Sequence, residues 1–120
     1  MSEGESFWNY LDRLVASSQV VIERRRGAAH PDYPDMVYPL AYGYLAGTSA
    51  ADGDEVDVWI GSGDTAQVSA VLVTVDLLKR DTEVKVMLGC TPAEQQAALA
   101  FLNGSDLLRA WLVPRPPTVV

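Results

Sequence analysis

The stretch from residue 19 to residue 90 constrains the fold most, because it consists of short β-prone segments joined by turn residues. Val68–Val75 is rich in β-branched residues, and Glu55–Ile60 alternates apolar and polar side chains. No helical pattern separates one segment from the next, so the alternation that builds a parallel doubly wound sheet is absent. This order predicts a small β-barrel.

Helical patterns stand on either side of this stretch. One apolar stripe at helical spacing comprises Phe7, Tyr10, Leu11, Leu14 and Val15. Thr91-Pro92-Ala93-Glu94 has the residues of a capping box and predicts a helix that runs to about Asn103, while residues 105–113 fit either a helix or an extended piece. We therefore expect a single mainly β domain of the α+β class, made of an N-terminal helix (1–18), a barrel (19–90), a C-terminal helical part (91–113) and a loose tail (114–120).

The composition excludes several classes of protein. With 120 residues, 48% of them apolar and 21% charged, the chain has the composition of a globular domain. Its net charge of -7 lacks the basic surface of a nucleic-acid binder. No apolar run reaches the roughly 18 residues that cross a membrane, and no signal pattern opens the chain, so we expect a cytoplasmic protein. Cys90 and His30 are single residues of their type, which excludes a disulfide and a cysteine- or histidine-rich metal site.

Acidic side chains gather near two turns. Three fall within six residues and two more flank the Leu77–Arg80 turn: Asp52, Asp54, Asp57, Asp76 and Asp81. Carboxylate oxygens are hard ligands that suit Mg²⁺ or Mn²⁺. A calcium loop of the EF-hand type does not fit, because Gly53 stands second in the run rather than sixth. The spacing alone leaves two readings open, a cation site and a solvated turn.

These same residues resemble a known family. Asp52–Val58 (DGDEVDV) resembles the D-x-D-[PE]-x-D-x signature of soluble family I inorganic pyrophosphatases. Val37–Tyr44 (VYPLAYGY) resembles that family's YPxNYGF segment, and Val20–Glu23 resembles its first active-site strand. Asp76 and Asp81 match the spacing of the family's second aspartate pair. The stretch HPxYPD before the tyrosines is similar to that of a compact bacterial subgroup.

The resemblance implies a fold, a cofactor and a reaction. The fold would be a small five-stranded OB-like barrel with a helix at each end of the chain. The reaction would be hydrolysis of inorganic pyrophosphate to two phosphates by a water activated by Mg²⁺, with Mn²⁺ as an alternative. The implied roles are Asp54 as proton acceptor, Glu23 as an outer-shell metal residue, Tyr42 and Lys85 as phosphate ligands, and four metal ligands: Asp52, Asp57, Asp76 and Asp81.

The chain departs from the family pattern mainly in the residues that hold phosphate. The hairpin that carries a phosphate-binding lysine is absent after Glu23, which leaves Arg25 or Arg26 to substitute. Glu83 stands where the family has a lysine, and Lys85 follows two residues later on the same strand face. The C-terminal Tyr-Lys pair has no counterpart. Two alternatives therefore stay open: hydrolysis of an organic or nucleotide diphosphate, and a non-catalytic metal-binding relative. A homo-oligomer is also left open.

Overall fold

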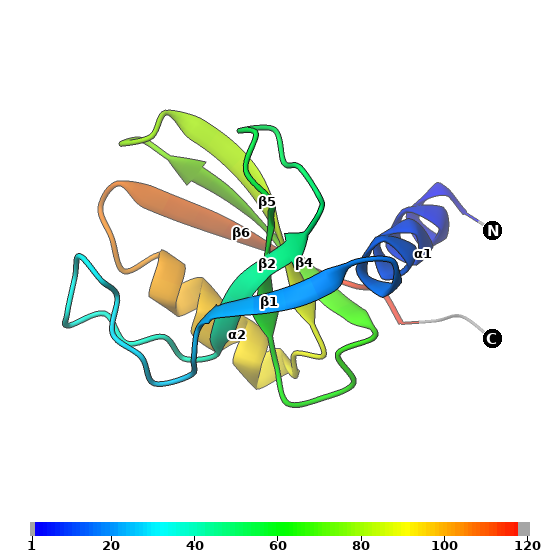
Figure 1. Cartoon of the computed structure of the whole chain (residues 1–120), viewed down its shortest axis with the longest axis horizontal. Coiled ribbons are helices and arrows are strands. Elements are labelled where there is room, and N and C mark those ends of the chain that lie inside the picture. Colours follow the sequence, from blue (N-terminus) through cyan, green and yellow to red (C-terminus); the bar gives the residue numbers. More distant parts are fainter. Residues whose placement is uncertain (1, 118–120) are drawn as a thin grey trace.

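The computed structural model describes residues 2–117 and contains two helices and six strands (Figure 1). In chain order they are α1 (Glu3–Ala16), β1 (Gln19–Arg24), β2 (Ala41–Ala46), β3 (Val56–Ile60), β4 (Val68–Asp76), β5 (Asp81–Leu88), α2 (Pro92–Leu102) and β6 (Leu108–Pro114). Both predicted helices are present. The capping box at Thr91 and Glu94 is formed, which explains where α2 begins.

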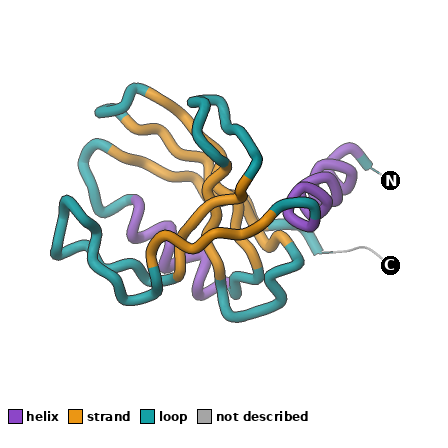
Figure 2. Tube along the Cα trace, in the orientation of Figure 1, coloured by secondary structure: helices purple, strands orange, loops and turns teal. Residues whose placement is uncertain are grey.

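The six strands form one curled sheet in the order β1-β2-β3-β5-β4-β6 (Figure 2). Neighbouring strands are antiparallel except β3 and β5, which run parallel. In the described part of the chain β1 and β6 are the two edges, so the barrel is partly open, as in OB-like folds. The predicted α+β class and OB-like architecture are confirmed.

The C-terminal part differs from the expectation of a helical segment over 91–113 and of five strands. The helix ends at Leu102, and β6 pairs with β4 along its whole length, from Ala70 opposite Pro114 to Asp76 opposite Leu108. The physical reason is that β4 would otherwise leave its backbone groups unpaired on that side. The predicted loose tail is wrong at Arg115, whose guanidinium bonds Asp12; residues 118–120 lie outside the described residues.

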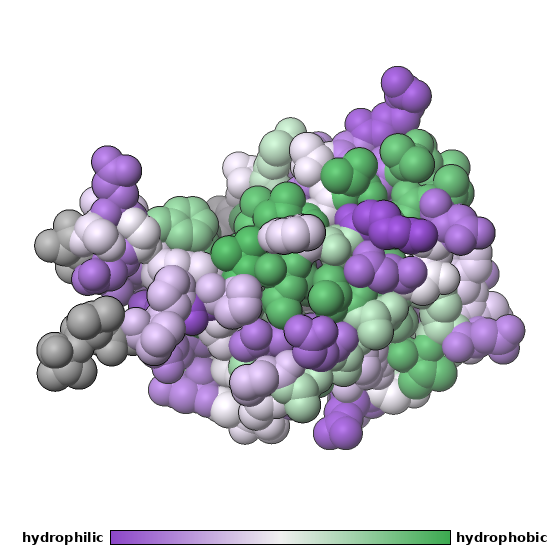
Figure 3. All heavy atoms as spheres, turned by 180° about the vertical axis from the view of Figure 1, so that it is seen from behind, coloured by the Kyte–Doolittle hydropathy of each residue, from purple (hydrophilic) through white to green (hydrophobic). Residues whose placement is uncertain are grey.

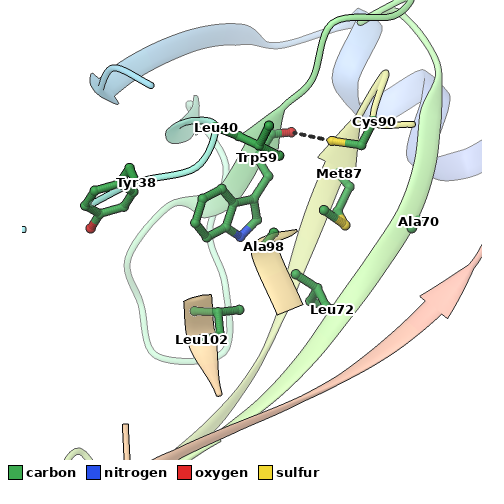
Figure 4. Close-up of a cluster of buried hydrophobic side chains, with 9 residues drawn as sticks. All are labelled: Tyr38, Leu40, Trp59, Ala70, Leu72, Met87, Cys90, Ala98 and Leu102. Atoms are coloured by element: carbon green, nitrogen blue, oxygen red, sulfur yellow. Dashed lines mark hydrogen bonds between the residues drawn. The ribbon is translucent and has the colours of Figure 1, made fainter. Parts of the chain in front are cut away.

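Side chains alternate between the two faces of the sheet, and each face carries its own core cluster. The face toward α2 buries Tyr38, Leu40, Trp59, Ala70, Leu72, Met87, Cys90, Ala98 and Leu102 (Figure 4). The face toward α1 buries Trp8, Val15, Leu45, Val58, Val68, Val71, Val86 and Leu88. On β3 the neighbours Val58 and Trp59 fall in different clusters, as the predicted alternation requires.

Close approach of two strands explains one glycine. A Cβ added at Gly43 on β2 would lie 1.8 Å from the carbonyl oxygen of Val21 on β1. Only glycine therefore lets β1 pair with β2 at this point. Beyond β1, residues 25–40 form a long connection that contains one isolated bridge, between Ala29 and Val37. This connection brings His30, Tyr33 and Tyr38 to the α2 side of the sheet.

Part of the sheet surface stays apolar and exposed. Figure 3 shows apolar side chains gathered on the face seen from behind. Val84, Val73 and Trp111 are cross-strand neighbours on β5, β4 and β6, and Trp111 is 75% exposed. A surface of this kind is typical of protein contacts, and the homo-oligomer stays a prediction. None of the helices in the described residues is long and apolar enough to cross a membrane.

Candidate metal centre and substrate cavity

The polar site is the outer end of the α2 face of the sheet. Along β4 this face presents Ala70 and Leu72, then Thr74 and Asp76. Along β5 it presents Met87, then three polar residues that approach the β4–β5 turn, namely Lys85, Glu83 and Asp81. Every second residue of β4 and β5 therefore faces α2, and these residues change from apolar in the core to mostly charged near the β4–β5 turn.

Lys85 connects the parts of this site. Its Nζ donates to Asp57 Oδ2 at 2.8 Å, to Tyr42 Oη at 2.9 Å and to Glu83 Oε2 at 3.1 Å. These three acceptors match the three donors of an ammonium group. Asp57 and Tyr42 come from β3 and β2, so one side chain ties together three strands.

The charge state of this cluster follows from its burial and its contacts. Burial opposes the charged form of Lys85, but Tyr42 and Asp57 outweigh it and raise the pKa of the ammonium. Burial also raises the pKa of the Tyr42 phenol, although the nearby Lys85 charge works in the opposite direction. At neutral pH the site therefore contains a fixed positive charge beside a neutral phenol.

Three carboxylates meet beside Lys85. One oxygen each of Asp52, Asp81 and Glu83 lies within 4.8 Å of the others. A hydrogen bond between Asp52 and Glu83 lowers the pKa of Asp52 and raises the pKa of Glu83, and burial raises the latter further. Mg²⁺ holds oxygen ligands at about 2.0–2.1 Å, so opposite ligands stand roughly 4 Å apart. The donor type and the spacing of these three residues fit such an ion.

The other predicted metal ligands lie near this group but outside it. Asp57 is held by Lys85. Asp76 lies opposite Asp81 across the β4–β5 pair, and its Oδ1 accepts from the backbone N–H of Leu78 and Lys79 at 2.9 and 3.0 Å. The metal-binding roles of Asp57 and Asp76 stay predictions.

The predicted catalytic and outer-shell residues are exposed. Asp54 lies in the acidic loop, where its backbone N–H donates to Asp52 Oδ1 at 3.1 Å. Glu23 and Arg25 lie at the end of β1 and beyond it, and neither lines the cavity described below. Of the predicted site residues, the structure brings Asp52, Tyr42 and Lys85 together, and Asp57, Asp76 and Asp81 lie around them. Three predicted residues, Asp54, Glu23 and Arg25, lie at the periphery of the site.

A cavity of about 710 Å³ opens on this cluster. Its polar end is formed by Asp76, Lys79, Asp81, Glu83 and Lys85. Its other end is walled by aromatic side chains, namely His30, Tyr33, Tyr38, Trp59 and Phe101. The loop between α2 and β6 (residues 104–108) lines the cavity beside the polar end, where Leu77 N–H donates to the Leu107 carbonyl at 2.8 Å. A ligand that binds its charged part near the carboxylates therefore has apolar space beside it.

Comparison with known proteins identifies the family. The family model described as Inorganic Pyrophosphatase matches residues 19–111. The chain belongs to the inorganic pyrophosphatase family. This membership classes it with the phosphoanhydride hydrolases, and the resemblance read from residues 19–88 is confirmed.

Solved pyrophosphatases share the fold at low sequence identity. The enzyme from Helicobacter pylori aligns with a TM-score of 0.54 and 16% identity over 79% of this chain and 81% of that one. The enzyme from Coxiella burnetii aligns with a TM-score of 0.52 and 16% identity over 79% and 82%. No curated protein sequence gives a significant match. At this identity the two structures support the pyrophosphatase fold.

Glu83 is the site residue that the sequence reading did not assign. In the sequence Glu83 only interrupts the family pattern, and no metal-binding or catalytic role is predicted for it. The signal was available in the alternation of β5, which places Glu83 on the same face as Asp81 and Lys85. The sequence does not reveal that the loop carrying Asp52 approaches β5, which brings Asp52 close to Asp81 and Glu83.

Proposed function

We propose that this chain hydrolyses inorganic pyrophosphate to two phosphates with a divalent cation, Mg²⁺ or Mn²⁺, held by Asp52, Asp81 and Glu83. The observation that carries the proposal is the convergence of these three carboxylates beside a buried ammonium group, at the mouth of a cavity, in a chain of the pyrophosphatase family. Oxygen-only ligands match the preference of both ions.

Each residue has a distinct task in this proposal. When bound, the cation lowers the pKa of a water molecule and neutralises charge on the phosphates. Lys85 and Tyr42 both face Asp57, and each exchanges that contact for a phosphate oxygen when substrate enters. Asp54 accepts the proton of the attacking water, and its exposed position next to Asp52 leaves it free to turn toward the cation.

The remaining roles rest on the resemblance. Asp57 and Asp76 add metal contacts, Glu23 acts through water, and Arg25 replaces the missing phosphate ligands. Apolar walls around Trp59 and Phe101 keep bulk water away and strengthen the electrostatic contacts of the site. The cytoplasmic location belongs to this proposal and is supported by the sequence alone. The homo-oligomer also belongs to it and is supported by the exposed apolar surface around Trp111.

Phosphate release from pyrophosphate, with and without Mg²⁺ or Mn²⁺, tests the function. We expect activity only with a cation, and Asp81→Asn should lower kcat/KM by more than the roughly 10–100-fold typical of outer-shell partners. Asp35→Asn is the matched control, because Asp35 is an exposed loop aspartate outside the cavity. If the wild-type protein releases no phosphate above a blank with either cation, the proposal fails.

A further inference from the structure

The cavity is much larger than the polar cluster that it serves. Its volume of about 710 Å³ falls in the range of roughly 300–1,000 Å³ that holds drug-sized ligands. Pyrophosphate consists of two phosphoryl groups and needs only the end beside the carboxylates. The rest of the cavity, from Tyr42 to His30 and Tyr33, faces no charged group of an inorganic substrate.

Aromatic rings surround this second part of the cavity. Tyr38 lies 4.8 Å from Phe101 and 6.0 Å from Trp59, measured between ring centroids, and His30 lies parallel to Tyr38 at 6.1 Å. Figure 4 shows the Tyr38 ring beside the Trp59 indole. Aromatic walls of this kind bind planar groups by stacking and by edge contacts.

The polar and aromatic parts meet at one residue. The Tyr42 hydroxyl is hydrogen-bonded to Lys85, and its ring lies 4.7 Å from the Trp59 ring and 5.8 Å from the Tyr38 ring. A molecule whose phosphates contact Lys85 can therefore place an attached planar group against Tyr38 and Phe101 without leaving the cavity.

The charge at the far end fits a base rather than a further phosphate. Asp32 lines the cavity there, and a carboxylate repels phosphate but accepts hydrogen bonds from amino and ring N–H groups. Lys79 and Lys85 stand at the opposite, polar end. The charge distribution therefore orients a ligand that has phosphates at one end and hydrogen-bond donors at the other.

From these observations we infer that the cavity takes a nucleoside 5′-diphosphate as a second substrate, an inference that rests on the proposed function of the same centre. Water attacks the terminal phosphorus and forms the new P–O bond. The bond from that phosphorus to the bridging oxygen breaks, and the bridging oxygen leaves on the nucleoside monophosphate. The products are a nucleoside monophosphate, inorganic phosphate and one proton, with no change in oxidation state.

Substrate competition in one assay tests the inference. Phosphate release is measured with Mg²⁺ from pyrophosphate, ADP and isopentenyl diphosphate, the last of which has an organic group without a planar base. We expect release from ADP well above release from isopentenyl diphosphate. Equal or faster hydrolysis of isopentenyl diphosphate overturns the nucleoside assignment. Hydrolysis of pyrophosphate without hydrolysis of ADP overturns the inference and leaves the proposed function standing, whereas hydrolysis of ADP alone supports the inference and overturns pyrophosphate as the substrate.

A matched pair of variants locates the base. Met36 is partly buried and lines the cavity in the connection that carries His30 and Tyr33, so Met36→Trp fills that end. We expect kcat/KM for ADP to fall by about tenfold or more and that for pyrophosphate to stay within about twofold. Leu14→Trp on α1, outside the cavity, should change neither value. Equal losses for ADP and pyrophosphate in Met36→Trp would contradict the inference.

A binding measurement needs no catalysis. In isotope-labelled protein, AMP should shift the indole N–H resonance of Trp59, while those of Trp8 and Trp111 stay in place. Trp8 packs on the α1 face and Trp111 is exposed on β6, so both serve as internal controls. No shift of Trp59 at saturating AMP, or equal shifts of all three resonances, rules the proposed base site out.

Discussion

At the residue scale, Glu83 is one of the positions at which this chain departs from the family pattern. It lies between Asp52 and Lys85, accepts from Lys85 Nζ at 3.1 Å, and shares a hydrogen bond with Asp52. A lysine at this position would add a second positive charge beside Lys85. In the proposed cation site a carboxylate instead adds a third hard ligand, at the position where the family pattern has a phosphate-binding lysine.

Replacing this carboxylate should weaken cation binding directly. For Glu83→Gln we expect Mg²⁺ or Mn²⁺ affinity, measured by calorimetry, to fall by at least about tenfold. Glu55→Gln is the control, because it removes the same charge from an exposed position near the acidic loop and outside the trio. If both variants lose cation affinity equally, Glu83 acts through its charge at long range and does not bind the cation directly.

Cys90 gives a prediction about how the free energy of unfolding depends on pH. Burial, and then the nearby Glu94 charge, raise the pKa of the Cys90 thiol to about 11 from its usual 9.0. Because the folded pKa is raised, the thiol favours folding fully below pH 9, and this contribution is lost as the pH rises toward 11. The free energy of unfolding, measured in urea at pH 8 and at pH 10.5, should fall more steeply in the wild type than in Cys90→Ala. Parallel slopes would show that the thiol does not ionise on unfolding.

At the element scale, the acidic loop between β2 and β3 decides whether Asp52 reaches the strand residues. The loop is closed by its own backbone, with Gly53 N–H donating to the Ala50 carbonyl at 3.0 Å. At its start, Thr48 Oγ1 accepts from Val56 N–H at 3.0 Å. Gly53 has a φ of 88°, in the left-handed region that other residues adopt only with strain.

Alanine at this glycine should loosen the cation site. Gly53→Ala costs about 1–2 kcal/mol of backbone strain, which the loop can relieve by moving Asp52. We expect weaker Mn²⁺ binding by calorimetry together with a small loss of stability. Gly47→Ala is matched, since Gly47 has a φ of 80° and also has open space around its Cα. A loss of Mn²⁺ affinity in both variants, or in neither, would contradict the prediction that Gly53 places Asp52 at the cation site.

Some of the helices and strands could be predicted from the sequence, and others could not. Alternation predicted β3 and its two faces, and capping residues predicted α2, because these signals are local. The sequence leaves residues 105–113 open between a helix and an extended piece, because Leu108–Pro114 becomes extended by pairing with β4 rather than by its own pattern. The motifs predicted Asp52, Tyr42 and Lys85 within one site. Glu83 could not be assigned, because its role depends on the approach of a loop that is distant in sequence.

At the scale of the whole molecule, the cavity exists because α2 and the connection over residues 25–40 lie over one face of the sheet. Leu72 on β4 is fully buried in the cluster that joins this face to α2. Leu72→Ala should lower the free energy of unfolding by about 2–5 kcal/mol, since it removes buried contacts and leaves a void. Leu77→Ala, at an exposed leucine of the β4–β5 turn, should change it by no more than about 0.5 kcal/mol. Urea denaturation followed by circular dichroism gives both values, and similar losses in the two variants would mean that the α2 face is not a packed core.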